Sequence, residues 1–129
     1  MCRKLDIFIL EDAPERCEWF LRIFHGCNIS LTDKVGEACE ILRNNQYDIV
    51  FLDRDLGHFT ENGEDVARVM KQERLCTDAT IVIHTVNTIG QMVMKRYFEN
   101  YSNVYVIPFS QLLNYYYHKG SRFLIQRDH

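Results

Sequence analysis

The sequence lacks the features that would place the protein in a membrane or in an oxidising compartment. No apolar run approaches the ~18 residues that a membrane-spanning helix needs. The apolar run near the N-terminus, 5–10, is too short for the core of a secretion signal. The five cysteines are odd in number and include no Cys-x-x-Cys pair, so neither a disulfide framework nor a zinc site is expected. We therefore expect a cytoplasmic protein with free thiols and no contact with a membrane.

A large excess of charge, an internal linker and a low-complexity segment are also missing. The formal net charge is −3, which argues against a non-specific attraction to nucleic acid over the whole surface. The hydrophobic fraction of 47% and the charged fraction of 26% are close to globular averages. We predict one domain over residues 1–120 and a tail, 121–129, that packs on the domain or on a partner. The sequence does not define an oligomeric state.

Short apolar runs alternate with helical patterns along the chain. The runs are continuous rather than alternating, which is typical of parallel strands covered on both faces. This order predicts an α/β fold with a doubly wound, five-stranded parallel sheet of flavodoxin-like order 2-1-3-4-5, as in receiver domains. Asp12 with Glu15, and Thr32, are the predicted N-caps of the first two helices. The predicted strands are 5–10, 28–31 (an edge strand), 49–52, 81–83 and 104–107, and the predicted helices are 14–25, 33–43, 64–74, one from about 88 and one after Ser110.

Polar residues follow the strands whose carboxyl ends would meet in such a sheet. Glu11 and Asp12 follow the first strand, Asp53 and Asp55 follow the third, and His84 ends the fourth. Ligands bind at this edge, near the switch point of the strand order. Crowded carboxylates repel one another unless a cation intervenes, and oxygen ligands suit Mg²⁺ or Mn²⁺. We therefore predict a metal site formed by the four acids, the alternative being that Asp12 is a helix cap and Asp53 a turn residue.

Four further side chains are candidates for substrate binding or catalysis at this site. His84 has a near-neutral pKa suited to proton transfer, although a lone histidine at a strand end is often a hydrogen-bonded core residue. Arg16 could contact an anionic substrate or pair with Asp12 four residues earlier. Arg54 could hold a phosphate or form salt bridges within its own loop. Asn87 precedes a helix whose free N–H groups could receive a phosphate.

Four segments of the sequence resemble a known family. They are FILEDAPER (8–16), VFLDRDLG (50–57), NGEDVA (62–67) and IHTVNTIGQMVM (83–94). They are similar to the cyclic-phosphate processing receiver family, a group related to the receiver domains of bacterial response regulators. The likeness runs from about Ile7 to Pro108. It implies a receiver fold and action on cyclic phosphates, such as 2′,3′-cyclic RNA ends, with the acids and the histidine forming the site.

The sequence departs from these patterns at four positions. Response regulator receivers have a small hydroxyl residue at the end of the fourth strand and a lysine before the proline after the fifth. Here His84 and Ile107 occupy those places. The histidine that the cyclic-phosphate family has between its aspartates is Arg54, and the asparagine before its last methionine is Val93. Without the lysine, a phosphorylation switch is the weaker interpretation.

These observations lead to one functional prediction and two alternatives. The prediction is a metal-dependent phosphodiesterase that acts on a cyclic phosphate of RNA or of a nucleotide. Asp53 and His84 would be catalytic, and Arg16, Arg54 and Asn87 would hold the phosphate. The alternatives are a regulatory receiver phosphorylated at Asp53, and a module that binds a nucleotide or a partner without turnover.

Overall fold

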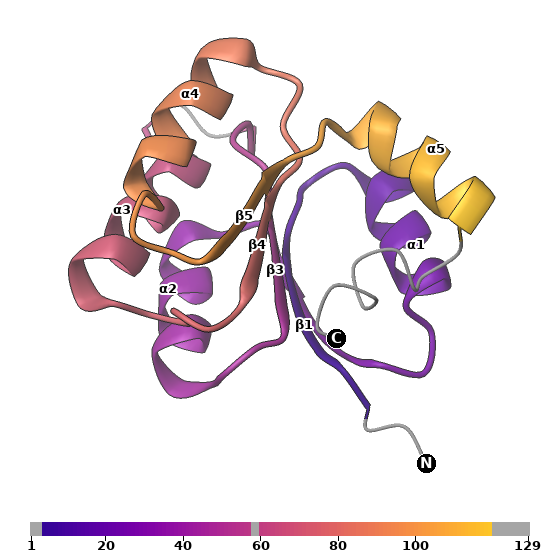
Figure 1. Cartoon of the computed structure of the whole chain (residues 1–129), viewed down its shortest axis with the longest axis horizontal. Coiled ribbons are helices and arrows are strands. Elements are labelled where there is room, and N and C mark those ends of the chain that lie inside the picture. The colour runs from indigo at the N-terminus through magenta and orange to yellow at the C-terminus, as the bar shows by residue number, and fades with distance from the viewer. Residues whose placement is uncertain (1–3, 58–59, 120–129) are drawn as a thin grey trace.

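The structure is a computed structural model, and it describes residues 4–57 and 60–119. Strands and helices alternate along this part of the chain, as the apolar pattern predicts (Figure 1). The boundaries agree with the predicted ones to within a few residues. The elements are β1 (Asp6–Leu10), α1 (Pro14–Ile23), β2 (Asn28–Thr32), α2 (Val35–Asn44), β3 (Ile49–Leu52), α3 (Gly63–Glu73), β4 (Thr80–Ile83), α4 (Thr88–Tyr97), β5 (Asn103–Val106) and α5 (Phe109–Lys119).

The strands form one five-stranded sheet of order β2-β1-β3-β4-β5. All neighbouring strands are parallel, which confirms the predicted flavodoxin-like topology. Helices α1 and α5 cover one face of the sheet, and α2, α3 and α4 cover the other (Figure 1). The fold is therefore a three-layer α/β/α arrangement in which both faces of the sheet are buried.

The strand side chains alternate between two hydrophobic cores, one on each face of the sheet. The core beneath α2, α3 and α4 includes Leu52 and Ile83. The core beneath α1 and α5 includes Ile9, Phe51 and Val82. Because residues two apart on a strand share a face, the residue that follows each of β1, β3 and β4 continues the α1/α5 side.

Helix α1 does not begin in the way the sequence indicated. The prediction of an Asp12–Glu15 capping pair is wrong, because the N-cap residue is Ala13 and no side chain bonds to the helix from that position. Instead, Glu11 Oε2 accepts hydrogen bonds from the backbone N–H groups of Asp12 and Ala13, both at 3.1 Å. The carboxylate that ends β1 therefore also organises the turn into α1.

The N-terminal ends of α2 and α3 differ in their capping. Thr32 is not the cap of α2, which is Lys34; Thr32 Oγ1 accepts the Lys34 N–H at 3.2 Å in the preceding turn. At α3, by contrast, a complete capping box is present. The Asn62 side chain accepts the Glu64 N–H at 2.8 Å, and the Asp65 carboxylate accepts the Asn62 N–H at 2.9 Å. This box fixes the start of α3 against the loop that follows β3.

Two expectations concern features other than the sheet. None of the helices in the described part of the chain has the length and apolar character needed to cross a membrane. The cysteines of this part are free thiols, as predicted, with Cys39 and Cys76 buried and Cys17 and Cys27 half-buried. The prediction that the tail 121–129 packs on the domain or a partner lies outside the described residues.

Candidate active site

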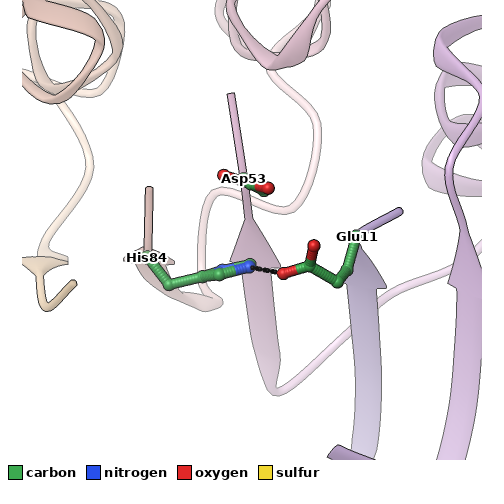
Figure 2. A group of neighbouring side chains, drawn as sticks. All are labelled: Glu11, Asp53 and His84. Carbon is green, nitrogen blue, oxygen red and sulfur yellow. Dashed lines mark hydrogen bonds and ion pairs between the residues drawn. The ribbon is translucent and has the colours of Figure 1, made fainter. Parts of the chain in front are cut away.

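Three neighbouring strands end side by side at the carboxyl edge of the sheet. The register aligns the last residues of β1, β3 and β4, so the residues that follow them, Glu11, Asp53 and His84, are aligned as well. All three are buried. One ligand atom from each residue lies within 4.8 Å of those of the other two, with Asp53 beside the line from His84 to Glu11 (Figure 2). The convergence follows from the topology and the register.

His84 and Glu11 form a fully buried pair. The imidazole Nε2 donates a hydrogen bond of 2.8 Å to Glu11 Oε1, and both side chains are inaccessible to solvent. Since the partner is an acceptor, the Nε2 atom carries a proton. In the described chain, the other ring nitrogen, Nδ1, has no hydrogen-bond partner. The rest of the ring is enclosed by aromatic side chains from three elements, namely Phe20, Phe51 and Phe109.

The Glu11 carboxylate remains ionised although it is buried. Burial raises its pKa, but the hydrogen bond and charge of His84, the Ala13 N–H and the charge of Arg16 outweigh that effect and hold the pKa of Glu11 below its usual value. Both carboxylate oxygens are engaged, one by the imidazole and one by the backbone at the start of α1. Glu11 is therefore an anchored anion.

At Asp53, the effects that raise the pKa outweigh those that lower it. Burial raises the pKa of Asp53 to about 6, the Glu11 charge adds to the effect, and His84, the Arg54 N–H and Arg16 only partly oppose it. Its Oδ1 accepts the Arg54 backbone N–H at 2.8 Å. Burial and the Glu11 charge also raise the pKa of Asp12. At Asp53 and Asp12, burial and negative charge outweigh the interactions that favour ionisation, whereas at Glu11 the interactions that favour ionisation prevail.

Arg16 brings a cation to this cluster from α1. Its Nη1 lies 3.8 Å from Glu11 Oε1 and 4.0 Å from Asp53 Oδ2. The guanidinium carbon lies 4.9 Å from the centre of the Phe109 ring, a cation–π distance. Arg16 thus pairs with Glu11 and Asp53 rather than with Asp12, the partner expected from i,i+4 spacing. About a quarter of the side chain, 27%, is exposed, so the guanidinium connects the buried acids to solvent.

Arg54 and Asp55 lie outside the buried cluster. The Arg54 guanidinium binds Glu64 through Nε and Asp55 through Nη1, the latter at 2.8 Å. This agrees with the salt-bridge alternative for Arg54. The Asp55 side chain is 55% exposed, and it is not among the groups that converge with Asp53. The structure therefore does not bring the Asp55 carboxylate to the predicted metal site.

Asn87 is the N-cap of α4. Its side-chain oxygen accepts the Gly90 N–H at 2.9 Å, and its own N–H donates to Thr85 Oγ1 at 3.2 Å. The Gln91 side-chain amide donates to the Thr85 carbonyl at 2.8 Å. These bonds hold the loop after His84 against the first turn of α4. The oxygen of Asn87 is occupied by capping, and the residue's contribution to the site is to fix this loop.

Two glycines shape the site, and their role was missed by sequence reasoning. A Cβ atom on Gly63 would lie 1.8 Å from the Asp53 carbonyl oxygen, and one on Gly90 would lie 2.4 Å from Arg54 Cδ. Gly63 therefore lets α3 approach the end of β3, and Gly90 lets the Arg54 side chain cross the start of α4. Both glycines belong to the family-like segments, but spacing alone does not reveal what each one approaches. Glu64, the partner of Arg54, was missed as well.

The fold and this site define a receiver-like domain. The sequence matches the family described as the cyclic-phosphate processing receiver domain over residues 8–100, more than half of the chain. The protein therefore belongs to this family, as its motifs indicated. No curated protein matches the sequence.

Several solved structures with the same fold are response regulators or receiver domains. A two-component response regulator from Clostridium difficile has 19% identity and a TM-score of 0.70 over 97% of this chain and 98% of its own. The receiver domain of the Francisella response regulator 1452 has 13% identity and a TM-score of 0.67 over 98% of this chain and 100% of its own. The receiver domain of a Pseudomonas aeruginosa sensor histidine kinase, with a magnesium ion in its active site cleft, has 15% identity and a TM-score of 0.63 over 87% and 93%. At these identities the likeness concerns the fold.

Proposed function

We propose that this protein is a metal-dependent phosphodiesterase that hydrolyses a cyclic phosphate on an RNA end or a nucleotide. The observation that carries the proposal is the buried Glu11–His84 pair beside Asp53, with the Arg16 guanidinium next to both acids. This arrangement joins a proton-holding pair, a carboxyl group with a raised pKa and a cation suited to a phosphate. Membership of the cyclic-phosphate processing receiver family supports the choice of substrate.

The donor set fits a divalent cation. Asp53, which is buried, and Asp12, which is half-buried, both have a raised pKa because of desolvation and the nearby Glu11 charge. A cation between carboxylates relieves that repulsion. Carboxylate oxygens suit Mg²⁺ or Mn²⁺. We assign Asp53 and Asp12 as the holders: Asp53 converges with Glu11 and His84, and Asp12 follows Glu11 just outside that group. Glu11 is fixed by its existing hydrogen bonds. When bound, such an ion polarises a phosphoryl oxygen and lowers the pKa of a water molecule.

The remaining groups act on the phosphate and on protons. Arg16 binds the phosphate, because its guanidinium is already beside Asp53 and remains partly open to solvent. Glu11 Oε1 accepts the proton on His84 Nε2 through their 2.8 Å hydrogen bond and keeps it in place, so the pair is a fixed unit beside Asp53. His84 is a positioning residue in this scheme, since its ring is wholly buried. Arg54 and Asn87 act by holding the two loops that border the site, and Arg54 would contact the phosphate only after leaving Glu64.

The aliphatic residue Ile107 argues against a phosphorylation switch at Asp53. Ile107 is buried, and its N–H donates to the Ile83 carbonyl at 3.0 Å. An aliphatic side chain there cannot pair with an acyl phosphate in the way a lysine does. Arg16, on α1, supplies a cation 4.0 Å from Asp53 Oδ2, where it can accompany an incoming phosphate. A phosphorylation switch and turnover-free binding remain as outcomes of the test.

The test is an assay of 2′,3′-cyclic AMP hydrolysis in the presence of Mg²⁺, of Mn²⁺ or of a chelator. The products are measured by chromatography. We expect a metal-dependent release of the monophosphate. The Asp53→Asn variant should lose at least about 10² in rate. The His84→Gln variant keeps a donor for Glu11 but loses the imidazole, so it should retain metal binding and lose rate.

Two controls separate the alternatives. Incubation with acetyl phosphate and measurement of intact mass detects a phosphorylation switch, since Asp53 would gain a phosphoryl group. Calorimetric titration of the cyclic nucleotide detects binding without turnover. Asp55→Asn is the matched variant, because it removes an exposed carboxylate two residues away, and it should keep full activity. Equal activity in the wild type and Asp53→Asn would rule out the proposed mechanism.

A further inference from the structure

A polar pocket lies between α3 and α4, away from the acidic site. The two helices pack side by side on one face of the sheet (Figure 1). The pocket is formed at their C-terminal ends, next to the loops that lead into β4 and β5, and thus at the opposite edge of the sheet from Asp53. Its volume is about 460 Å³, within the range of small-molecule sites. Its walls include Lys71, Gln72, Arg74, Thr77, Tyr97 and Asn100.

The lining of this pocket carries positive charge and no carboxylate. Over residues 4–57 and 60–119, the side chains of Lys71 and Arg74 have no hydrogen bond or ion pair. The acid nearest to Arg74 in sequence, Glu73, is already held by two hydrogen bonds from Arg43, both at 2.8 Å. On the same helix, Arg68 is paired with Asp65. Two exposed cations without partners among the described residues therefore line one hollow.

Two residues at this wall have a left-handed backbone conformation that is unfavourable for residues other than glycine. Arg74 and Cys76 are the non-glycine residues with positive φ in the described chain, at 54° and 51°. Helices usually end with glycine in the left-handed conformation that Arg74 adopts. The Tyr101 hydroxyl holds the loop in this shape, because its one proton is shared between the carbonyls of Met70 and Leu75, at Oη–O distances of 3.1 and 2.6 Å. Strain of this kind is concentrated at binding sites, which indicates a use for the Arg74 side chain.

We propose that this pocket binds a nucleoside monophosphate. Lys71 and Arg74 would hold the phosphate through charge-assisted hydrogen bonds. The half-buried ring of Tyr97 would pack against the base, and the Gln72 and Asn100 amides can both donate to and accept from its edge. The alternative is that the two cations only offset the negative ends of the helices. The site is separate from the acidic cluster and does not depend on the proposed phosphodiesterase activity.

The experiment is calorimetric titration of the full chain with AMP, adenosine and inorganic phosphate, in the presence of a chelator. We expect AMP to bind more tightly than either fragment. Lys71→Ala and Arg74→Gly should each weaken AMP binding by about tenfold or more. Arg68→Ala is the matched control, since it removes a paired cation from the same helix, and Asp53→Asn tests the acidic site; both should bind AMP like the wild type.

Thermal unfolding of Arg74→Gly distinguishes a ligand-binding role from a structural one. Glycine adopts the left-handed conformation freely, so this variant should melt at a higher temperature while binding AMP less well. A lower melting temperature would show that the arginine supports the helix end, and would overturn the proposal. So would the absence of AMP binding, equal binding of adenosine or of phosphate, or loss of binding in Asp53→Asn.

Discussion

Replacing Asp53 by asparagine should stabilise the metal-free protein at neutral pH. The Asp53 side chain is almost fully buried, and burial raises its pKa from the usual 3.8 to about 6. Ionisation is therefore harder in the folded protein than in the unfolded chain. Asparagine keeps an oxygen that can accept the Arg54 N–H and carries no charge, so the unfavourable buried charge disappears while the local hydrogen bond remains.

The effect should depend on pH in a defined direction. Below about pH 4 the carboxyl group is protonated in both states, and the variant gains nothing. Between pH 4 and pH 6 the unfolded chain releases a proton that the folded protein retains, so the free energy of unfolding of the wild type falls as pH rises. Above about pH 6 the free energy of unfolding of the wild type stays lowered by a constant amount. A pKa difference of about two corresponds to about 3 kcal/mol.

Urea unfolding in a chelating buffer measures this difference. At pH 8 the unfolding midpoint of Asp53→Asn should exceed that of the wild type by about 1–2 M urea, and at pH 4 the two midpoints should coincide. Mg²⁺ should stabilise the wild type and leave the variant unchanged, since binding to the folded state alone raises stability. Asp55→Asn, which changes an exposed carboxylate, should show little effect at either pH. A lower midpoint for Asp53→Asn at pH 8 would refute the electrostatic reasoning.

Three further perturbations test the geometry around the site. Glu11→Gln places an amide NH₂, which is a donor, opposite either the His84 N–H or the N–H groups at the start of α1. This clash of donors should lower the free energy of unfolding by about 2–3 kcal/mol. An unchanged urea midpoint would contradict the hydrogen-bond scheme. Gly63→Ala would bring a methyl group to 1.8 Å from the Asp53 carbonyl oxygen, so we expect a loss of about 3 kcal/mol or more, seen by circular dichroism. Burial raises the pKa of Cys17 to about 11, so at pH 8 about one thiol in a thousand is ionised; alkylation at the rate of a small free thiol would contradict this.

The fold could be predicted because each layer leaves a local pattern in the sequence. Continuous apolar runs such as 49–52 mark strands buried on both faces, and β3 has the predicted bounds. The helices show apolar stripes, but their ends are less well defined: α1 ends at Ile23, two residues before the predicted end. Helix ends depend on backbone hydrogen bonds in the last turn, which side-chain periodicity does not report.

The convergence of Glu11, Asp53 and His84 could be predicted, but their partners could not. Strand order and parallel pairing bring the three strand ends together whatever the side chains are. Arg16 was expected near Asp12 through helical spacing, yet α1 begins only at Pro14, so Asp12 lies outside the helix.

Asp55 was expected in the site for a similar reason, and the structure leaves it outside. Asp53 and Asp55 would share a face if the strand continued, but β3 ends at Leu52. The chain then turns away, and Asp55 pairs with Arg54 at the surface. Contacts of this kind depend on where an element stops, which the sequence pattern defines least well.

Hydrolysis of 2′,3′-cyclic AMP in ¹⁸O-labelled water tests the central claim most directly. Mass spectrometry of the products and of the protein follows the label after multiple turnovers with Mn²⁺. If the site directs a water molecule at the phosphate, one ¹⁸O atom should appear in the monophosphate and none in Asp53. Label in the Asp53 carboxyl group would instead show that water attacks the carboxyl carbon of a covalent aspartyl intermediate, and the absence of any labelled monophosphate would contradict the proposed hydrolysis.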